Sequence, residues 1–144
     1  MPVRNADAEW NGDLMQGGGK MRLGSGAYEG AYSFKSRMGD DATGANPEEL
    51  IAAAHAGCFS MALSFALASA GHTPKSVKTS AKVHFDKVGD GFAITKIELD
   101  TVGDVPGLDA AGFEQAAQGA KANCPVSKAL SAVPIELTAS LAGG

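Results

Sequence analysis

Hydrophobic and polar positions alternate with a period of two in the first third of the chain and predict short β-strands. In residues 6–10, Ala6, Ala8 and Trp10 face one way while Asp7 and Glu9 face the other. We expect two more strands at residues 21–25 and 31–35, joined around residues 26–30. We expect the glycine triplet at 17–19 to be a loop, because no strand-to-helix context or following Ser or Thr supports a phosphate-binding loop.

A polar loop is expected over residues 37–45, including Asp40 and Asp41, and a long helix follows it. Asn46 suits the N-cap, Pro47 the first helical position, and Glu49 the third position of a capping box. Residues 50–70 carry no formal charge, and their large apolar side chains are spread around the helical period. We therefore expect a central helix that is buried nearly all round and ends at Gly71.

This helix is about 20 residues long, which is enough to cross a bilayer. It is mostly alanine, is diluted by His55, Gly57 and several serines, and lacks an asymmetry of flanking Lys and Arg. We therefore do not expect it to span a membrane. We expect it to be wrapped by a β-sheet and by another subunit.

Alternation returns after Pro74 and predicts an antiparallel hairpin. Its strands are residues 77–85 and 93–101, with a turn at residues 89–91. Phe92 and Ile94 fall on the polar side of this count, which indicates a bulge or extra burial near the turn.

A second helix and a short third helix complete the predicted elements. Asp109 caps the second helix, and Leu108 with Phe113 forms a hydrophobic staple. Pro125 interrupts its apolar face just after Cys124, and residues 125–130 are predicted to start a short helix. Residues 133–141 alternate as a final strand, with Pro134 favouring an edge position. The order predicts an α+β fold in one domain, residues 1–144.

Composition excludes several classes of protein. The net charge is −4 and the pI is near 5.3, so no basic surface for nucleic acid or an anionic membrane is indicated. Residues 1–5 contain no apolar core of a secretory signal, and we expect a cytoplasmic protein. The two cysteines, Cys58 and Cys124, fit no zinc-ribbon spacing, and a permanent disulfide is disfavoured in the cytosol. We therefore expect the two cysteines to be free, catalytic or redox-active thiols.

Three kinds of thiol chemistry can be weighed from the residues alone. His55 lies one turn before Cys58 on the same helix face, but Cys58, His55 and Cys124 are too few for a metal site, and none is expected. A Cys58–His55 hydrolase lacks a local protease signature, and His55 is more typical of a satisfied core histidine. Cys124, at a helix N-terminus, is locally the better thiolate, whereas Cys58 needs a cation such as Arg37.

The chain resembles the OsmC/Ohr family of thiol peroxidases, named for osmotically inducible protein C and organic hydroperoxide resistance protein. The resemblance is closer to the OsmC branch and covers most of the chain. It is carried by NPEELIAAAHAGCFSMALS at 46–64, AEWNGD at 8–13, DKV at 86–88, GFAITKI at 91–97 and NCPVS at 123–127.

The resemblance implies roles for four residues. Cys58 corresponds to the peroxidatic cysteine and Cys124 to the resolving cysteine. Arg37 corresponds to the active-site arginine, with Lys35 or Arg22 as alternatives. Glu48 corresponds to the carboxylate, with Glu49 as its competitor.

The implied fold is the OsmC-like fold, antiparallel sheets around a long central helix in an intertwined two-fold dimer. The implied activity is an antioxidant peroxidase that passes through a Cys58 sulfenic acid and a Cys58–Cys124 disulfide, with an external dithiol donor and no bound cofactor. Apolar neighbours of Cys58, including Phe59, Met61 and Phe65, favour organic hydroperoxides over hydrogen peroxide. The alternatives are a stress-related dimer with inert buried thiols and the Cys58–His55 hydrolase.

Helix geometry adds a constraint on the dimer. Glu48 and Cys58 are ten residues apart on one helix, or about 15 Å along its axis. If both serve one site, Arg37 and Glu48 must come from one chain and Cys58 and Cys124 from its two-fold partner.

Overall fold

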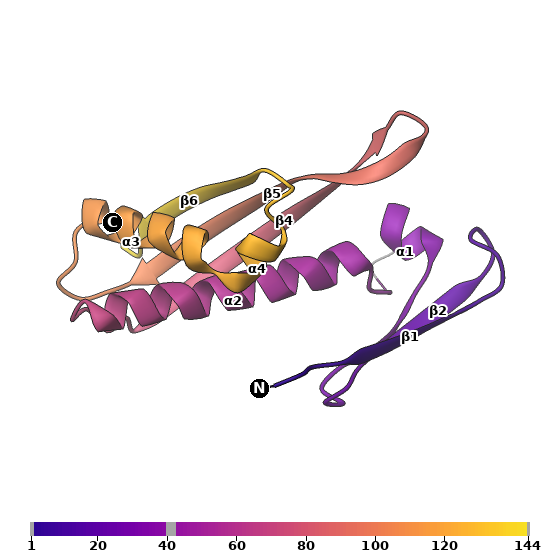
Figure 1. Cartoon of the computed structure of the whole chain (residues 1–144), viewed down its shortest axis with the longest axis horizontal. Coiled ribbons are helices and arrows are strands. Elements are labelled where there is room, and N and C mark those ends of the chain that lie inside the picture. Colours follow the sequence, from indigo (N-terminus) through magenta and orange to yellow (C-terminus); the bar gives the residue numbers. More distant parts are fainter. Residues whose placement is uncertain (1, 40–42, 144) are drawn as a thin grey trace. The chain divides into compact units, whose positions relative to one another are not determined.

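The computed structural model describes residues 2–39 and 43–143 (Figure 1). Asp40 and Asp41 of the predicted polar loop lie outside these residues. The chain divides into two units, Met1–Leu50 and Ile51–Gly144, and each is described by itself.

The first unit is built on a three-stranded antiparallel sheet in the order β1-β2-β3. Its strands are β1 (Ala6–Asn11), β2 (Gly18–Leu23) and β3 (Glu29–Tyr32), so the three predicted strands are present. The glycine triplet is only partly a loop, because β2 begins at Gly18. The rings of Trp10 and Tyr32 pack edge to face, 5.3 Å apart, over Gly19, where any side chain would collide with them.

A short helix, α1 (Phe34–Met38), follows β3, where the sequence predicted the end of a strand and the start of a loop. That prediction was wrong, because Ser33 and Ser36 form a reciprocal capping box. The Ser33 hydroxyl accepts the Ser36 N–H at 3.0 Å, and the Ser36 hydroxyl accepts the Ser33 N–H at 2.9 Å. The hydroxyl of Ser36 also donates to the carbonyl of Ala45, and this bond ties α1 to the residues before the next helix.

The long helix α2 (Pro47–Ser69) has the predicted ends. The side chain of Asn46 accepts the N–H of Glu49 at 2.8 Å, as an N-cap does. At the other end Gly71 has a φ of 90°, and the N–H of His72 donates to the carbonyl of Leu67. This is the left-handed glycine termination that the sequence predicted.

The second unit contains a three-stranded sheet in the order β4-β5-β6. Strands β4 (Ser76–Val88) and β5 (Gly91–Asp104) form the predicted antiparallel hairpin, with a register shift between His84 and Phe85 near the turn. Strand β6 (Ile135–Leu141) lies at the edge, as Pro134 predicted, but it pairs with β5 in parallel. The sheet is therefore mixed rather than purely antiparallel, because alternation predicts a strand but not its direction.

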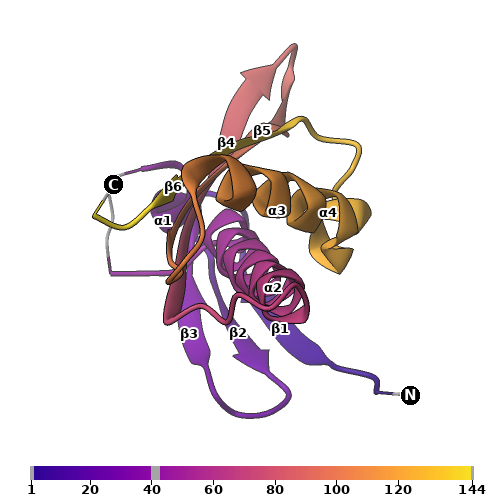
Figure 2. The same cartoon turned by 90° about the vertical axis from the view of Figure 1, so that its left-hand side faces the viewer.

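Helices α3 (Ala110–Asn123) and α4 (Pro125–Ala129) follow β5. The side chain of Asp109 accepts the N–H of Gly112 at 2.8 Å and caps α3 as predicted. In Figures 1 and 2, α3 and residues 51–69 of α2 lie against the same face of the β4-β5-β6 sheet. Their buried side chains form one core: Phe59, Leu63, Leu67, Ile97, Leu99, Val105, Phe113, Ala117, Ala120 and Cys124.

Within a single chain, helix α2 is not buried all round, and its expected burial by another subunit stays a prediction. Phe59, Leu63 and Leu67 recur every four residues and are 0–2% exposed, whereas Met61 and Phe65 are 76% and 75% exposed. Among the described residues, α2 is long and apolar enough to span a membrane by length and composition, a test that core helices also pass. The sheet and α3 cover one face of α2, and an apolar face is left open.

Candidate active site

Cys58 and Cys124 come from different elements and meet inside the second unit. Cys58 lies in the middle of α2 and is partly buried, while Cys124 lies between α3 and α4 and is fully buried. Both are free thiols; Cys58 packs against the core that contains Cys124, and each thiol shifts the pKa of the other. This contact brings together the two cysteines that the sequence singled out.

The environment of Cys58 favours the neutral thiol. Burial raises the pKa of Cys58, and the adjoining Cys124 side chain raises it further, while the N–H of Val126 partly offsets both effects. Within a single chain Cys58 is therefore the harder of the two thiols to ionise.

The environment of Cys124 favours the thiolate. Burial opposes ionisation, but hydrogen bonds from the Ser127 N–H, the Cys58 thiol, the Ser127 hydroxyl and the Val126 N–H outweigh it and lower the pKa of Cys124. Within a single chain Cys124 is therefore the easier of the two thiols to ionise. This agrees with the local preference found from the sequence.

His55 is fully buried one turn before Cys58, but its hydrogen-bond partner is Ser127. The Nε2 atom of His55 lies 2.7 Å from the Oγ of Ser127, and Nδ1 has no partner among the described residues. Burial lowers the pKa of His55, which keeps the ring neutral. Neither ring nitrogen bonds Cys58, so the Cys58–His55 pair that a hydrolase requires is not formed.

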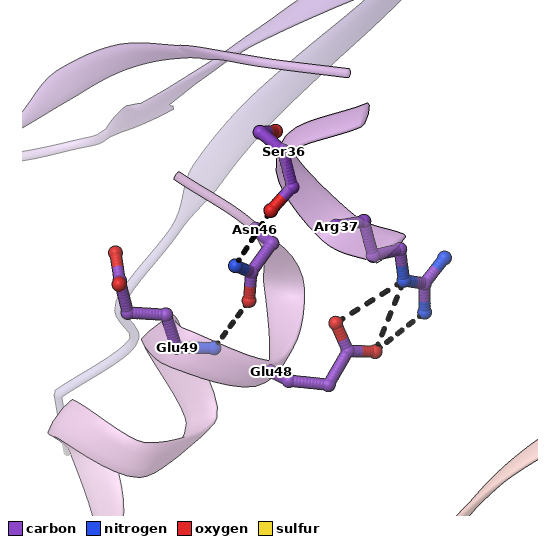
Figure 3. Close-up of polar contacts among 5 residues, drawn as sticks. All are labelled: Ser36, Arg37, Asn46, Glu48 and Glu49. Atoms are coloured by element: carbon purple, nitrogen blue, oxygen red, sulfur yellow. Dashed lines mark hydrogen bonds and ion pairs between the residues drawn. The ribbon is translucent and has the colours of Figure 1, made fainter. Parts of the chain in front are cut away.

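Arg37 and Glu48 form a two-pronged ion pair in the first unit (Figure 3). The Nη2 of Arg37 lies 2.6 Å from Oε1 of Glu48, and Nε donates at 3.1 Å to both carboxylate oxygens. The Glu48 side chain is 8% exposed and that of Arg37 is 38% exposed. The nearly buried carboxylate therefore holds the guanidinium in a fixed orientation, and the Arg37 side chain as a whole stays partly exposed.

The competing residues are placed differently. The Glu49 carboxylate points away from Arg37 in Figure 3, and its N–H is the group that Asn46 caps. Arg22 lies in β2 and Lys35 in the first turn of α1. The ion pair of Glu48 is with Arg37.

The site residues thus fall into two pairs, Arg37 with Glu48 in the first unit and Cys58 with Cys124 in the second. Within the described parts of the chain, no cluster of three or more His, Cys, Asp or Glu side chains could hold a metal ion. The sequence did not single out Ser127, although its position three residues after Cys124, in the first turn of α4, could have indicated a contact with that sulfur.

The fold is that of the OsmC and Ohr proteins. Across 99% of both chains, it matches the crystal structure of an organic hydroperoxide resistance protein from Elizabethkingia anophelis with a TM-score of 0.75 and 25% identity. An OsmC-like protein of unknown function from Vibrio cholerae matches 96% of this chain and 99% of its own with a TM-score of 0.76 and 16% identity.

The sequence comparison identifies the branch. Residues 39–138 match the family described as OsmC-like protein. The chain is 50% identical to the peroxiredoxin OsmC of Escherichia coli over 130 residues, and these residues make up 90% of each chain. The chain therefore belongs to the OsmC-like family, as the sequence motifs indicated.

Proposed function

We propose that this chain is a thiol-dependent peroxidase that reduces organic hydroperoxides, and hydrogen peroxide less well, with Cys58 as the attacking and Cys124 as the resolving cysteine. The observation that carries the proposal is that two free thiols, from α2 and from the α3–α4 junction, meet in one core and shift each other's pKa. The names of the relatives, peroxiredoxin and organic hydroperoxide resistance protein, support the same class of substrate.

The reaction has three steps. The Cys58 thiolate attacks one peroxide oxygen, the O–O bond breaks, and the alcohol leaves after taking a proton, so Cys58 becomes a sulfenic acid. The Cys124 thiolate then attacks the Cys58 sulfur, the S–O bond breaks, and hydroxide leaves and is protonated to water. An external dithiol reopens the disulfide by exchange, and no bound cofactor takes part.

Cys58 needs help to ionise, because burial and Cys124 both raise its pKa. A guanidinium beside Cys58 would reverse this balance. The Arg37–Glu48 pair is suited to supply it, since the carboxylate fixes the guanidinium in place. Glu48 and Cys58 are about 15 Å apart along α2, so we propose that a second copy of the chain provides Arg37 and Glu48.

A homodimer also accounts for the open face of α2. Met61 and Phe65 are three-quarters exposed in the single chain. Burying two large side chains of this kind stabilises an interface by about 1.5–3 kcal/mol each. Because the thiols must stay reduced between turnovers, we propose the cytoplasm as the compartment.

The test is peroxide consumption with a dithiol such as dithiothreitol as electron donor. We expect turnover of cumene hydroperoxide by the wild type, with a higher kcat/KM than for hydrogen peroxide, and no turnover by Cys58→Ser. Equal efficiency on both peroxides would contradict the substrate preference, and peroxide consumption by Cys58→Ser would contradict the assignment of the attacking cysteine. A stress-related dimer with inert thiols would consume no peroxide in any variant.

A further inference from the structure

We propose that His55 and Ser127 are positioning residues for the resolving step, because His55 directs the hydroxyl proton of Ser127 toward the sulfur of Cys124 and so holds that sulfur ready for attack. The inference rests on the proposed role of Cys124 as the resolving cysteine. It adds His55 and Ser127 to the proposed site as residues that act on Cys124 through hydrogen bonds and do not contact the peroxide.

The contacts form a continuous buried chain across the second unit. His55 in α2 is 0% exposed, Ser127 in α4 is 5% exposed, and Cys124 is 0% exposed. The Nε2 of His55 is 2.7 Å from the Oγ of Ser127, across 72 residues of sequence. Ser127 stands in the first turn of α4, three residues after its N-cap residue Cys124, and its hydroxyl lowers the pKa of the Cys124 thiol. A buried hydrogen bond is stronger than an exposed one. His55 therefore fixes the orientation of the Ser127 hydroxyl, and Ser127 in turn fixes the surroundings of the Cys124 sulfur.

The direction of this chain follows from the unpartnered Nδ1 of His55. If the ring proton were on Nδ1, a buried N–H donor would lack an acceptor, which is rarer in proteins than a buried acceptor without a donor. The proton is therefore on Nε2, which donates to the Oγ of Ser127. The single hydroxyl proton of Ser127 is then free to point at Cys124.

This arrangement matters most after Cys58 has reacted. In the reduced chain the Cys58 thiol also donates a hydrogen bond to Cys124, but a Cys58 sulfenic acid no longer carries that S–H. The Ser127 hydroxyl and the N–H groups of Val126 and Ser127 then remain to stabilise the Cys124 thiolate. The thiolate attacks the Cys58 sulfur, the S–S bond forms, and the S–O bond breaks with loss of hydroxide, which solvent protonates.

His55 serves here as a neutral donor and not as a proton carrier. Burial lowers the pKa of His55, so the imidazolium is disfavoured. The titratable groups facing Cys124 are Cys58 directly and His55 through Ser127. Lys121 and Lys128 line a surface hollow together with Ser127 and are the nearby cations.

The first test measures the Cys124 thiolate without any peroxide. In a Cys58→Ser background, the rate of Cys124 alkylation and the ultraviolet absorbance of the thiolate are followed against pH for Ser127→Ala, His55→Leu and the double variant. We expect each single change to lower the alkylation rate at neutral pH about tenfold, because a hydrogen bond to a charged group is lost. The double variant is expected to be no slower than either single variant, because both changes break the same chain.

The decisive comparison is His55→Gln, whose amide can donate a hydrogen bond to Ser127 but cannot take up a proton. We expect it to keep alkylation within about twofold of the parent. Ser131→Ala, an exposed serine in the turn after α4, is the matched control and is expected to change nothing. If His55→Gln is as slow as His55→Leu, or if the two single effects add, the proposal is wrong. Ser127→Ala removes one oxygen and provides the test should His55→Leu not fold.

A second measurement follows disulfide formation in the otherwise wild-type protein after one equivalent of peroxide. We expect Ser127→Ala and His55→Leu to form the Cys58 sulfenic acid at the normal rate and the disulfide about tenfold more slowly. A slowed first step would contradict a role confined to Cys124. If no disulfide forms even in the wild type, the proposed peroxidase fails, while the alkylation result still decides whether His55 and Ser127 act on Cys124.

Discussion

Arg37 and Glu48 are joined by a charge-assisted ion pair, with Nη2 of the guanidinium 2.6 Å from Oε1 of the carboxylate. The residues come from α1 and from the first turn of α2. The Ser36 hydroxyl donates to the carbonyl of Ala45, and the side-chain amide of Asn46 donates to the carbonyl of Ser36, so these bonds hold the two segments together. A guanidinium fixed in this way can lend its charge to a thiol without first losing side-chain freedom.

Glu48→Gln is expected to lower kcat/KM for cumene hydroperoxide about tenfold, since a neutral amide cannot hold the guanidinium by two charge-assisted bonds. The steady-state assay with a dithiol donor checks this. Glu49→Gln is the matched control and is expected to keep wild-type activity, because its carboxylate points away from Arg37. If the two variants behave alike, Glu48 is not the carboxylate of the site.

Met61→Asp is expected to convert the protein to a monomer and to abolish turnover, because it places a charge on the open apolar face of α2. Light scattering with size-exclusion chromatography checks the mass. Met15→Asp, at a residue that is 66% exposed in the first unit, is the control and should remain dimeric. A monomeric Met61→Asp protein with full activity would rule out a site shared between two chains.

Gly103→Ala is expected to lower the free energy of unfolding by about 1–3 kcal/mol, because the added methyl group would overlap the buried ring of Phe113. Gly119→Ala in α3 has open space around it and is expected to raise the free energy of unfolding by about 0.5–1 kcal/mol. Urea denaturation measures both. Equal effects at the two glycines would mean that the packing of Phe113 on β5 is not as described.

His55→Gln is expected to reduce the acid sensitivity of folding. Burial lowers the pKa of His55, so below about pH 6.5 the unfolded chain binds a proton that the folded chain does not. The wild type should therefore lose stability as the pH falls through that value, by at most about 1.4 kcal/mol per pH unit from this residue, until the lower pKa of the folded state is reached. Urea denaturation at about four pH values between pH 7.5 and pH 5 measures how steeply the free energy of unfolding depends on pH. The same dependence in the variant and the wild type would contradict the prediction.

The helix ends that the sequence predicted correctly are those set by local chemistry. Asn46 with Pro47 starts α2, Gly71 ends it, and Asp109 starts α3, because each acts on backbone groups a few residues away. Helix α1 was missed because five residues show no period and its cap is a pair of serines. The parallel pairing of β6 with β5 depends on how the chain returns through α3 and α4, which alternation does not encode.

Some features of the candidate site were likewise predictable from the sequence, and others were not. The motif around Cys58 and the one around Cys124 predicted both thiols, and the two side chains meet in one core. The bond between His55 and Ser127 was not predictable, because it joins residues 72 positions apart and depends on α4 packing beside α2. The exposure of Met61 and Phe65 follows from which face of α2 the sheet covers, and an all-apolar helix does not show that face in its sequence.

The most direct test is a titration of the reduced protein with cumene hydroperoxide, with free thiols and intact mass followed in the wild type, Cys58→Ser and Cys124→Ser. The proposed mechanism predicts loss of both thiols and a Cys58–Cys124 disulfide in the wild type, no reaction in Cys58→Ser, and a sulfenic or overoxidised Cys58 in Cys124→Ser. If both thiols stay reduced in the wild type, the two cysteines are not a peroxidase pair.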